Sequence, residues 1–299
     1  MPRRNLSPSR VAYNVVAYLF FALFTLLCVF PFYYMFINSI SSNEFASRGQ
    51  VLFYPRGVHF DNYLEILKIR DIGDAALVSV ARTVIGTVTN VFFTSFVAYI
   101  LSKKILWHRK FWYRFFIVTM YFNVGLLPWF INMQFLGLTN NFLAYVIAVI
   151  NPYNLVLVKT YIEGIPASLE ESAEIDGAGP VRIFLKIVFP LSKPIIATTA
   201  VFTAVMQWNQ VMDTIILMPT TSQWNTLQFL LWRYLNETNA VMMRLQGSGA
   251  ASMIDPSRLM TPTSLKMTIA MVVVLPILFV YPFFQRFFVK GIMLGSVKG

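Results

Sequence analysis

The sequence predicts an all-α integral membrane protein with six transmembrane helices and with both termini in the cytoplasm. Hydrophobic residues make up 57% of the 299 residues. Charged residues make up only 12%, about half the share expected of a soluble domain. The apolar residues are gathered in runs of about 20, the length that crosses a bilayer as a helix. The basic residues lie beside these runs, as they do at the cytoplasmic ends of membrane helices.

Uncharged or nearly uncharged runs define the six expected spans. Each run is expected to be helical because backbone amides need hydrogen-bond partners inside hydrocarbon. The longest uncharged run is divided into the third and fourth spans by a segment of turn-forming residues, 137–141. The expected spans are about 15–37, 77–101, 113–135, 141–160, 194–217 and 265–288. A transmembrane domain would thus cover 15–290, between cytoplasmic ends at 1–14 and 291–299.

The segment 102–114 determines the expected orientation. It is short, carries five basic residues and has no acidic residue. Short loops follow the positive-inside bias most closely, so this segment is expected in the cytosol. Two longer loops, 39–75 and 219–262, are then expected on the outer face.

Composition also excludes several other functions. The net charge of +11 would suit nucleic acid, but the basic residues flank apolar runs and form no single stripe, so no nucleic-acid partner is expected. His59 and His108 are far apart and have no cysteine partners, which predicts no metal site. Cys28 lies alone within an apolar run, so no disulfide framework is possible. No Ser/His/Asp or Cys/His set converges, and no catalytic residue is predicted.

The segment 163–190 is acidic on an otherwise basic face. Ser168 and Glu171 have the spacing of a capping box, which predicts a short helix starting at Ser168. Gly177 is expected to end that helix in a left-handed conformation, and Pro180 to begin a second helix. An apolar stripe is expected on the second helix, which Pro190 closes; the stripe comprises Val181, Phe184, Leu185 and Val188.

Two interpretations of this segment remain open on physical grounds. It can be an amphipathic connector lying on the lipid surface. It can also be a docking surface for a soluble partner. Carboxylates beside anionic lipid are poorly placed for membrane contact, which favours docking.

The spacing within this segment resembles the Glu-Ala-Ala loop of ATP-binding-cassette (ABC) importer permeases. Glu171-Ser172-Ala173 is followed by three residues, Gly177, nine more residues and then Ile187-Val188-Phe189-Pro190. Ser172 and Phe189 depart from the family pattern, and both are modest changes. The resemblance implies a type I importer permease fold in which this loop inserts, as a coupling helix, into a groove on a separate ATPase subunit. The coupling residues that it implies are Glu170, Glu171, Ala173, Asp176, Gly177, Ala178, Phe184 and Pro190.

Three further segments are similar to the carbohydrate-uptake branch of these permeases, including the smaller permease of maltose-type systems. They are residues 173–178, Trp208-Asn209 and the C-terminal 288–299. The resemblance implies an importer of a sugar, in particular an oligosaccharide, in a bacterial-type inner membrane. The implied partners are a second and different permease subunit, two ATPase subunits, an extracytoplasmic solute-binding protein and the lipid bilayer.

This division of labour agrees with a missing motif. The sequence contains no Gly-x-x-x-x-Gly-Lys-Ser/Thr phosphate loop. We therefore expect no cofactor in this chain, and expect ATP and Mg²⁺ to bind the partner ATPase.

An ion-coupled secondary transporter is the alternative function. Such proteins usually keep ionisable groups at mid-membrane. Here Arg82 and Asp213 lie near the expected ends of spans, which favours the importer.

Polar side chains within the spans are candidates for the substrate path. Amides can both donate to and accept from sugar hydroxyls. The same groups also serve as hydrogen-bonding contacts between membrane helices, and this second interpretation stays open. The candidates are Gln207, Trp208 and Asn209 in the fifth span, with Asn90, Asn123 and Asn132 elsewhere.

Overall fold

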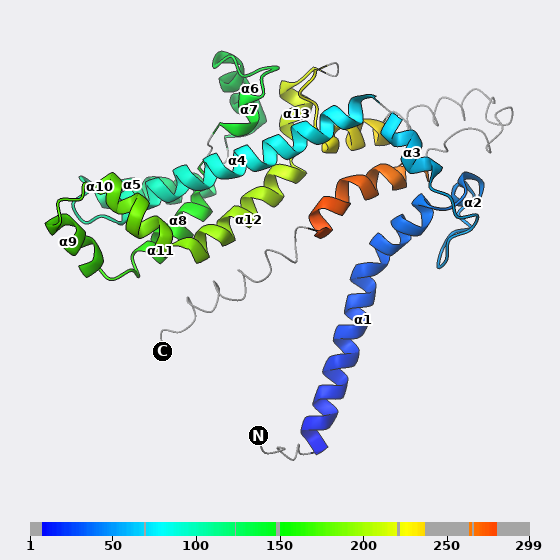
Figure 1. Ribbon diagram of the computed structural model, residues 1–299, viewed down its shortest axis with the longest axis horizontal. Helices are drawn as coiled ribbons and strands as arrows, with labels where there is room; N and C mark the ends of the chain where they lie inside the picture. Colours follow the sequence, from blue (N-terminus) through cyan, green and yellow to red (C-terminus); the bar gives the residue numbers. More distant parts are fainter. Residues whose placement is uncertain are drawn as a thin grey trace. The chain divides into compact units, whose positions relative to one another are not determined.

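A computed structural model describes residues 8–68, 70–122, 124–147, 150–219, 222–236, 263–264 and 266–279. Every regular element within these ranges is helical, as the sequence predicts (Figure 1). Asn123, most of the loop 235–262, the end of the sixth expected span and the tail 291–299 lie outside the described residues. The described residues form two compact units, one containing residues up to 68 and those between 234 and 274, the other containing the rest.

In the first unit, a long apolar helix ends in a small polar cluster. Helix α1 (Pro8–Ser39) is followed by α2 (Asn43–Ser47) and α3 (Asp61–Lys68). Asn38 at the end of α1 is fully buried and donates to the carbonyl oxygens of Tyr34 and Val51, at 2.9 and 3.2 Å. These bonds fasten the end of α1 to the loop that follows it.

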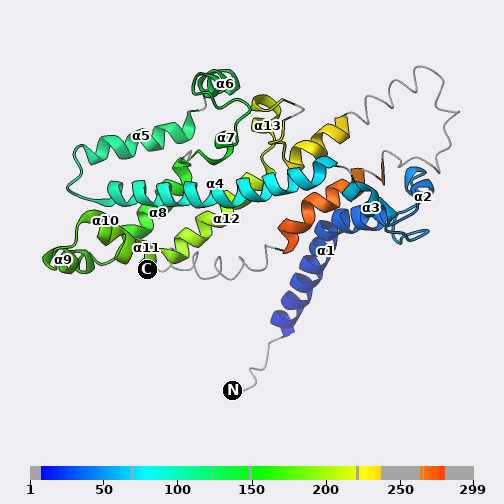
Figure 2. The same cartoon turned by 45° about the horizontal axis from the view of Figure 1, so that its top comes forward.

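The second unit is built around α4 (Arg70–Ser102), which packs against α8 (Pro152–Ile162) and α12 (Lys193–Asn209) (Figures 1 and 2). The remaining helices are α5 (Arg109–Tyr121), α6 (Leu126–Phe135), α7 (Leu143–Val146), α9 (Ser168–Ile175), α10 (Pro180–Ile183), the π-helix η1 (Phe184–Val188), α11 (Phe189–Leu191) and α13 (Met212–Leu217). A further helix covers 227–236, of which residues up to 233 belong to this unit. The shorter apolar helix Lys266–Phe279 belongs to the first unit as far as residue 274.

The core of the second unit joins the acidic segment to the long helices. Phe184 is 1% exposed, and its ring centroid lies 5.2 Å from that of Phe96 and 5.3 Å from that of Tyr99, both on α4. Ala173 of α9 and Leu155 of α8 belong to the same cluster. Burial of one such phenylalanine stabilises a fold by about 1.5–3 kcal/mol. The segment 163–190 is therefore part of the packed structure and not a loose connector.

Three of the expected spans are divided in the structure. The range 113–135 is divided between α5 and α6, and Gly125 before α6 has φ +82°. The range 141–160 begins with α7, and α8 starts afresh at Pro152, where the Asn151 side chain accepts from the backbone of Tyr153. The range 194–217 is divided at 210–211, between α12 and α13. The expected turn at 137–141 is present, with positive φ at Gly137 and Asn140.

Two described helices, Ser9–Ser39 and Asp71–Ser102, are each long and apolar enough to cross a membrane. Counting two bent pairs as one span each raises this number to four. One of these pairs is Pro180–Leu191 with Lys193–Asn209, bent by 82°. The six-span count therefore stays a prediction.

Candidate functional site

Helix α9 begins one residue earlier than a capping box requires. Ala167 has helical dihedral angles and precedes the helix without a side-chain cap, so Ser168 is already in the first turn. Its side chain therefore cannot act as the N-cap, and the predicted capping box is wrong. Backbone groups begin the helix instead, since the Ala167 carbonyl accepts from the amides of Glu170 and Glu171, both at 3.0 Å.

The end of α9 has the expected left-handed glycine. Gly177 has φ +77°, and its amide donates to the Glu174 carbonyl at 3.0 Å. The next amide, of Ala178, donates to the Ala173 carbonyl at 2.9 Å. This pair of bonds is the Schellman motif, which satisfies the last carbonyls of a helix and reverses the chain direction.

The second helix starts at Pro180 as expected but does not stop at Pro190. Helical structure continues through η1 and α11 to Leu191. Proline inside a helix lacks an amide and its ring collides with the carbonyl four residues before it. The wider π turn at Phe184–Val188 accommodates Pro190 at this point, so the proline is absorbed by a local widening.

The implied coupling residues face two directions. Ala173 and Phe184 are buried, and Ala178 and Pro190 are half-buried. Glu171, Asp176 and Gly177 are exposed. The set therefore contains an inward group, which packs α9 and η1 against the long helices, and an outward group available to another molecule.

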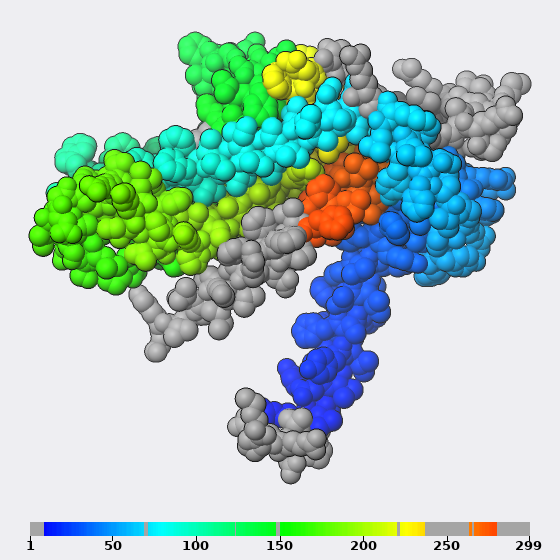
Figure 3. All heavy atoms as spheres, viewed as in Figure 1, coloured from blue at the N-terminus to red at the C-terminus, as the bar shows by residue number. Residues whose placement is uncertain are grey.

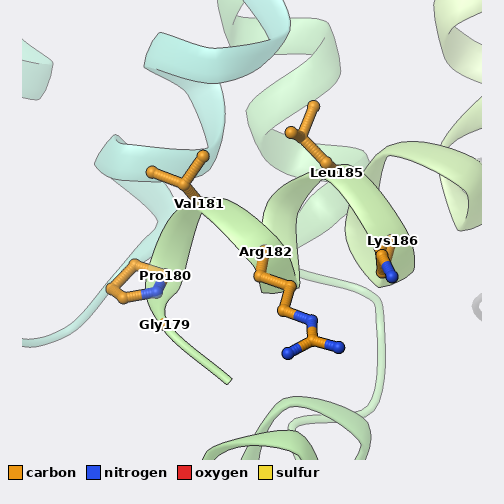
Figure 4. Close-up of a pocket in the computed structure, with 6 residues that line it drawn as sticks. All are labelled: Gly179, Pro180, Val181, Arg182, Leu185 and Lys186. Atoms are coloured by element: carbon orange, nitrogen blue, oxygen red, sulfur yellow. The ribbon is translucent and has the colours of Figure 1, made fainter.

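The expected apolar stripe also divides into two faces. Phe184 and Val188 are buried, whereas Val181 and Leu185 are 57% and 46% exposed. In Figure 4, Val181 and Leu185 point to one side of the helix and Arg182 to the other. A shallow pocket of about 530 Å³ lies here, lined by Gly179, Pro180, Val181, Arg182, Leu185 and Lys186.

Ile175 is an exposed apolar residue that the sequence analysis missed. It ends α9 and is 86% exposed. Its exposure could have been predicted, because Ile175 lies between the acidic residues Glu174 and Asp176 in the segment 163–190. The green spheres of α9 and α10 occupy an open end of this unit in Figure 3.

Ion pairs fix the inner side of this segment. Lys103, just after α4, pairs with Glu170 of α9, and its ammonium lies 4.2 Å from the centre of the Tyr99 ring. Burial lowers the pKa of Lys103 from its ordinary value, and the Glu174 charge offsets part of this effect. Glu163 pairs with both Arg109 and Lys159. Glu170 is thus bound within the chain, unlike its exposed neighbour Glu171.

The path candidates of α12 lie where that helix ends. Gln207 is half-buried, accepts from Arg82 Nε at 3.1 Å and donates to the Tyr145 carbonyl at 3.2 Å. Trp208 is half-buried, and Asn209 is exposed and accepts from Gln228 Nε2 at 3.1 Å.

The candidates outside α12 have different surroundings. Asn90 is buried in α4, where Thr94 Oγ1 lies 3.4 Å from its side-chain oxygen. Asn132 is exposed on α6. The structure does not describe Asn123.

The sequence analysis missed a buried ion pair beside Gln207. Arg82 is 2% exposed and belongs to α4. Its two terminal nitrogens donate to Asp213, at 3.1 and 2.5 Å. Arg82 and Asp213 carry opposite charges beside otherwise uncharged runs, and this pattern could have predicted that they pair. Among the described residues, no group of three His, Cys, Asp or Glu side chains is placed to hold a metal ion.

Comparison with known proteins gives one consistent set of relatives. No protein-family model matches the chain. The polygalacturonan/rhamnogalacturonan transport system permease protein YtcP of Bacillus subtilis is 36% identical over 288 residues, covering 96% of this chain and 98% of YtcP. Protein LplC of the same organism is 32% identical, covering 91% of this chain and 90% of LplC. The arabinooligosaccharides transport system permease protein AraQ of Halalkalibacterium halodurans is 25% identical, covering 93% and 94% of the two chains.

A solved structure is also similar. A chain from a bacterial ABC transporter that imports the acidic polysaccharide alginate matches with a TM-score of 0.80 and 29% identity. The match covers 96% of this chain and the whole of the other.

Proposed function

Because the chain belongs to the permeases of sugar-importing ABC transporters, we propose that it moves an oligosaccharide through the membrane under the control of a separate ATPase. It is a membrane transport subunit that works within a larger transporter complex. The single observation that carries the ATPase part of the proposal is the segment 163–190, which is packed against the long helices on one side and exposed on the other. Family membership also sets aside the alternative of an ion-coupled secondary transporter.

The ATPase docks on the exposed side of α9 and α10. Glu171 and Asp176 offer charge there, and Ile175, Val181 and Leu185 offer apolar contact. An apolar centre with a charged rim is the usual anatomy of a protein interface. When the ATPase changes shape, the segment moves with it. Phe184 and Ala173 on the buried side pack in one cluster with residues of α4 and α8, and they transmit this movement to those helices.

The partner ATPase binds ATP and Mg²⁺, since this sequence has no phosphate loop. The complete transporter contains two ATPase subunits, a second and different permease and an extracytoplasmic binding protein. The chain spans a bacterial-type inner membrane six times, with residues 1–14, the coupling segment 163–190 and residues 291–299 in the cytosol. The basic segment 102–114 supports this orientation.

The cargo is an oligosaccharide delivered by the binding protein. The names of the relatives include polygalacturonan/rhamnogalacturonan, arabinooligosaccharides and the acidic polysaccharide alginate. Uptake of labelled oligosaccharides by cells with and without this chain tests the proposal, using one acidic and one neutral series. We expect at least one series to enter only when the chain is present. Equal uptake of both series by cells without the chain would contradict the proposal.

The substrate path includes the end of α12. A sugar that leaves water needs replacement hydrogen bonds, and an unmet polar group costs several kcal/mol in hydrocarbon, about 2–7 by common measures. Asn209 is exposed and carries an amide, so it is suited to meet a sugar hydroxyl. The Asn209→Ala variant is expected to lower transport while the binding protein keeps its affinity for sugar. Normal transport by a complex that dissociates in detergent would instead make Asn209 a helix contact.

A further inference from the structure

Arg82 connects three other helices from within the second unit. Its Nε donates to Gln207 Oε1 on α12 at 3.1 Å, and its terminal nitrogens reach Asp213 of α13. One of them also donates to the backbone carbonyl of Gln210 at 3.1 Å. Its guanidinium carbon lies 4.4 Å from the centre of the Tyr145 ring on α7. The hydrogen bonds of Arg82 all go to residues between 207 and 213.

That point is the break between α12 and α13. Gln210 has an extended backbone (φ −70°, ψ 123°), so helical hydrogen bonding is interrupted there. A non-helical backbone at membrane depth persists only where it is buried in protein or lines a water-filled cavity. Arg82 supplies a donor to the Gln210 carbonyl, while Asp213 Oδ1 accepts from the Thr214 amide at 2.8 Å. The ion pair thus provides partners for the backbone on both sides of the break.

The guanidinium is committed to these contacts and is not free for a substrate. Arginine has five N–H groups, and four contacts with protein oxygens are present. Stability alone also explains the pair poorly, because replacing a buried ion pair by apolar residues is often neutral or stabilising. The fixed fork of the guanidinium is better suited to setting a geometry.

The packing around Gln207 is correspondingly close. A Cβ atom on Gly86 of α4 would lie 2.5 Å from Gln207 Nε2. The amide therefore occupies the space that a side chain at position 86 would fill. Gln207 is held from one side by Arg82 and from the other by the Tyr145 carbonyl.

We propose that Arg82 is a positioning residue for transport, which holds the break at 210–211 and thereby fixes Gln207 and the end of α12, where the candidate path residue Asn209 lies. The proposal rests on the proposed function, since it concerns the passage of sugar. Arg82 acts through its neighbours and does not touch the cargo. Loss of the Arg82 guanidinium should leave the coupling segment intact but shift the residues at the end of α12.

The test uses the complete importer, with its ATPase and binding protein, reconstituted in proteoliposomes. The double variant Arg82→Met/Asp213→Leu removes both charges and leaves neither one buried without a partner. We expect it to assemble and hydrolyse ATP, and to import at least about tenfold less sugar per ATP, because displacing a positioned group by ~1 Å can have effects of this size. Amide hydrogen exchange should become faster at 207–217 and stay unchanged at 168–190.

A second variant perturbs Gln207 and keeps both charges. Gly86→Ala forces the flexible Gln207 amide to move, and we expect sugar import per ATP to fall with normal assembly. Sugar import by the double variant equal to that of the unmodified chain overturns the proposal. Failure of the double variant to assemble also overturns it, because the pair would then serve folding. If the unmodified complex imports no sugar, the proposed function itself fails, which is a separate result.

Discussion

Gly177 is required by the backbone and not by packing. Its φ of +77° falls in the left-handed region, and among the described residues, apart from its neighbours in the chain, no atom lies within 4 Å of the position that a Cβ would take. For a residue with a Cβ, that region costs roughly 1–2 kcal/mol. A substitution here therefore acts through the conformation of the turn between α9 and α10, with no steric collision to confuse the result.

The Gly177→Val variant is expected to remain in the membrane and to lose most ATP-driven sugar uptake, because valine resists the left-handed conformation. Gly177→Asn is the matched control, since asparagine tolerates that conformation, and it should keep most of the uptake. Uptake and the amount of protein in the membrane are measured together. Normal uptake by a fully expressed Gly177→Val variant would refute the assigned role of this turn.

Single residues differed in how far the sequence alone predicted them. Gly177 and Pro180 could be predicted because their roles depend on local backbone geometry. The capping role of Ser168 failed because the preceding Ala167 was already helical. Arg82 and Asp213 are separated by 131 residues, and only the tertiary structure shows that they pair.

Two adjacent glutamates give α9 two different sides. Glu170 pairs with Lys103 inside the chain, and Glu171 is exposed. A helix turns by about 100° per residue, so neighbours in sequence face different surroundings. The element therefore has one side that is bound within the permease and one exposed side, on which we propose that the ATPase docks.

Glutamine substitutions separate these two roles. Glu171→Gln should weaken binding of the ATPase subunit by up to about fivefold, as expected for an exposed ion pair of at most about 1 kcal/mol. Glu170→Gln should leave that binding unchanged and reduce the sugar imported per ATP. Binding is measured between the detergent-purified permease complex and the ATPase, and import is measured in proteoliposomes. If both variants weaken ATPase binding equally, the two-sided account of α9 is wrong.

Helix interruptions were predicted only where local signals mark them. The turn at 137–141 has such signals. Asn151-Pro152 has them too, but the interruption there was not predicted. The break at 210–211 has no glycine or proline of its own. Arg82 of α4 donates to the Gln210 carbonyl at this break, a contact that periodicity along the sequence does not reveal.

The chain is similar to permeases over nearly its full length, so the class that its composition predicted is confirmed. Apolar runs and flanking charges suffice to predict a helical membrane protein. They do not show how helices bend. The orientation in the membrane is the main prediction at this scale.

Cysteine labelling checks the orientation. Cys28, which is exposed, is first replaced by serine. In intact cells an impermeant thiol reagent should label Leu52→Cys in the outer loop and should label Lys104→Cys only after permeabilisation. Both positions are exposed in the structure, so accessibility depends on the side of the membrane. Labelling of the Lys104→Cys variant in intact cells would contradict the predicted orientation.

The energy source of transport tests the central claim most directly. The permease, its partner permease, the ATPase and the sugar-loaded binding protein are reconstituted in proteoliposomes, and entry of labelled oligosaccharide is measured. We expect entry with hydrolysable ATP on the ATPase side, and none with a non-hydrolysable analogue or with a proton or sodium gradient alone. Uptake driven by an ion gradient without ATP would contradict the account.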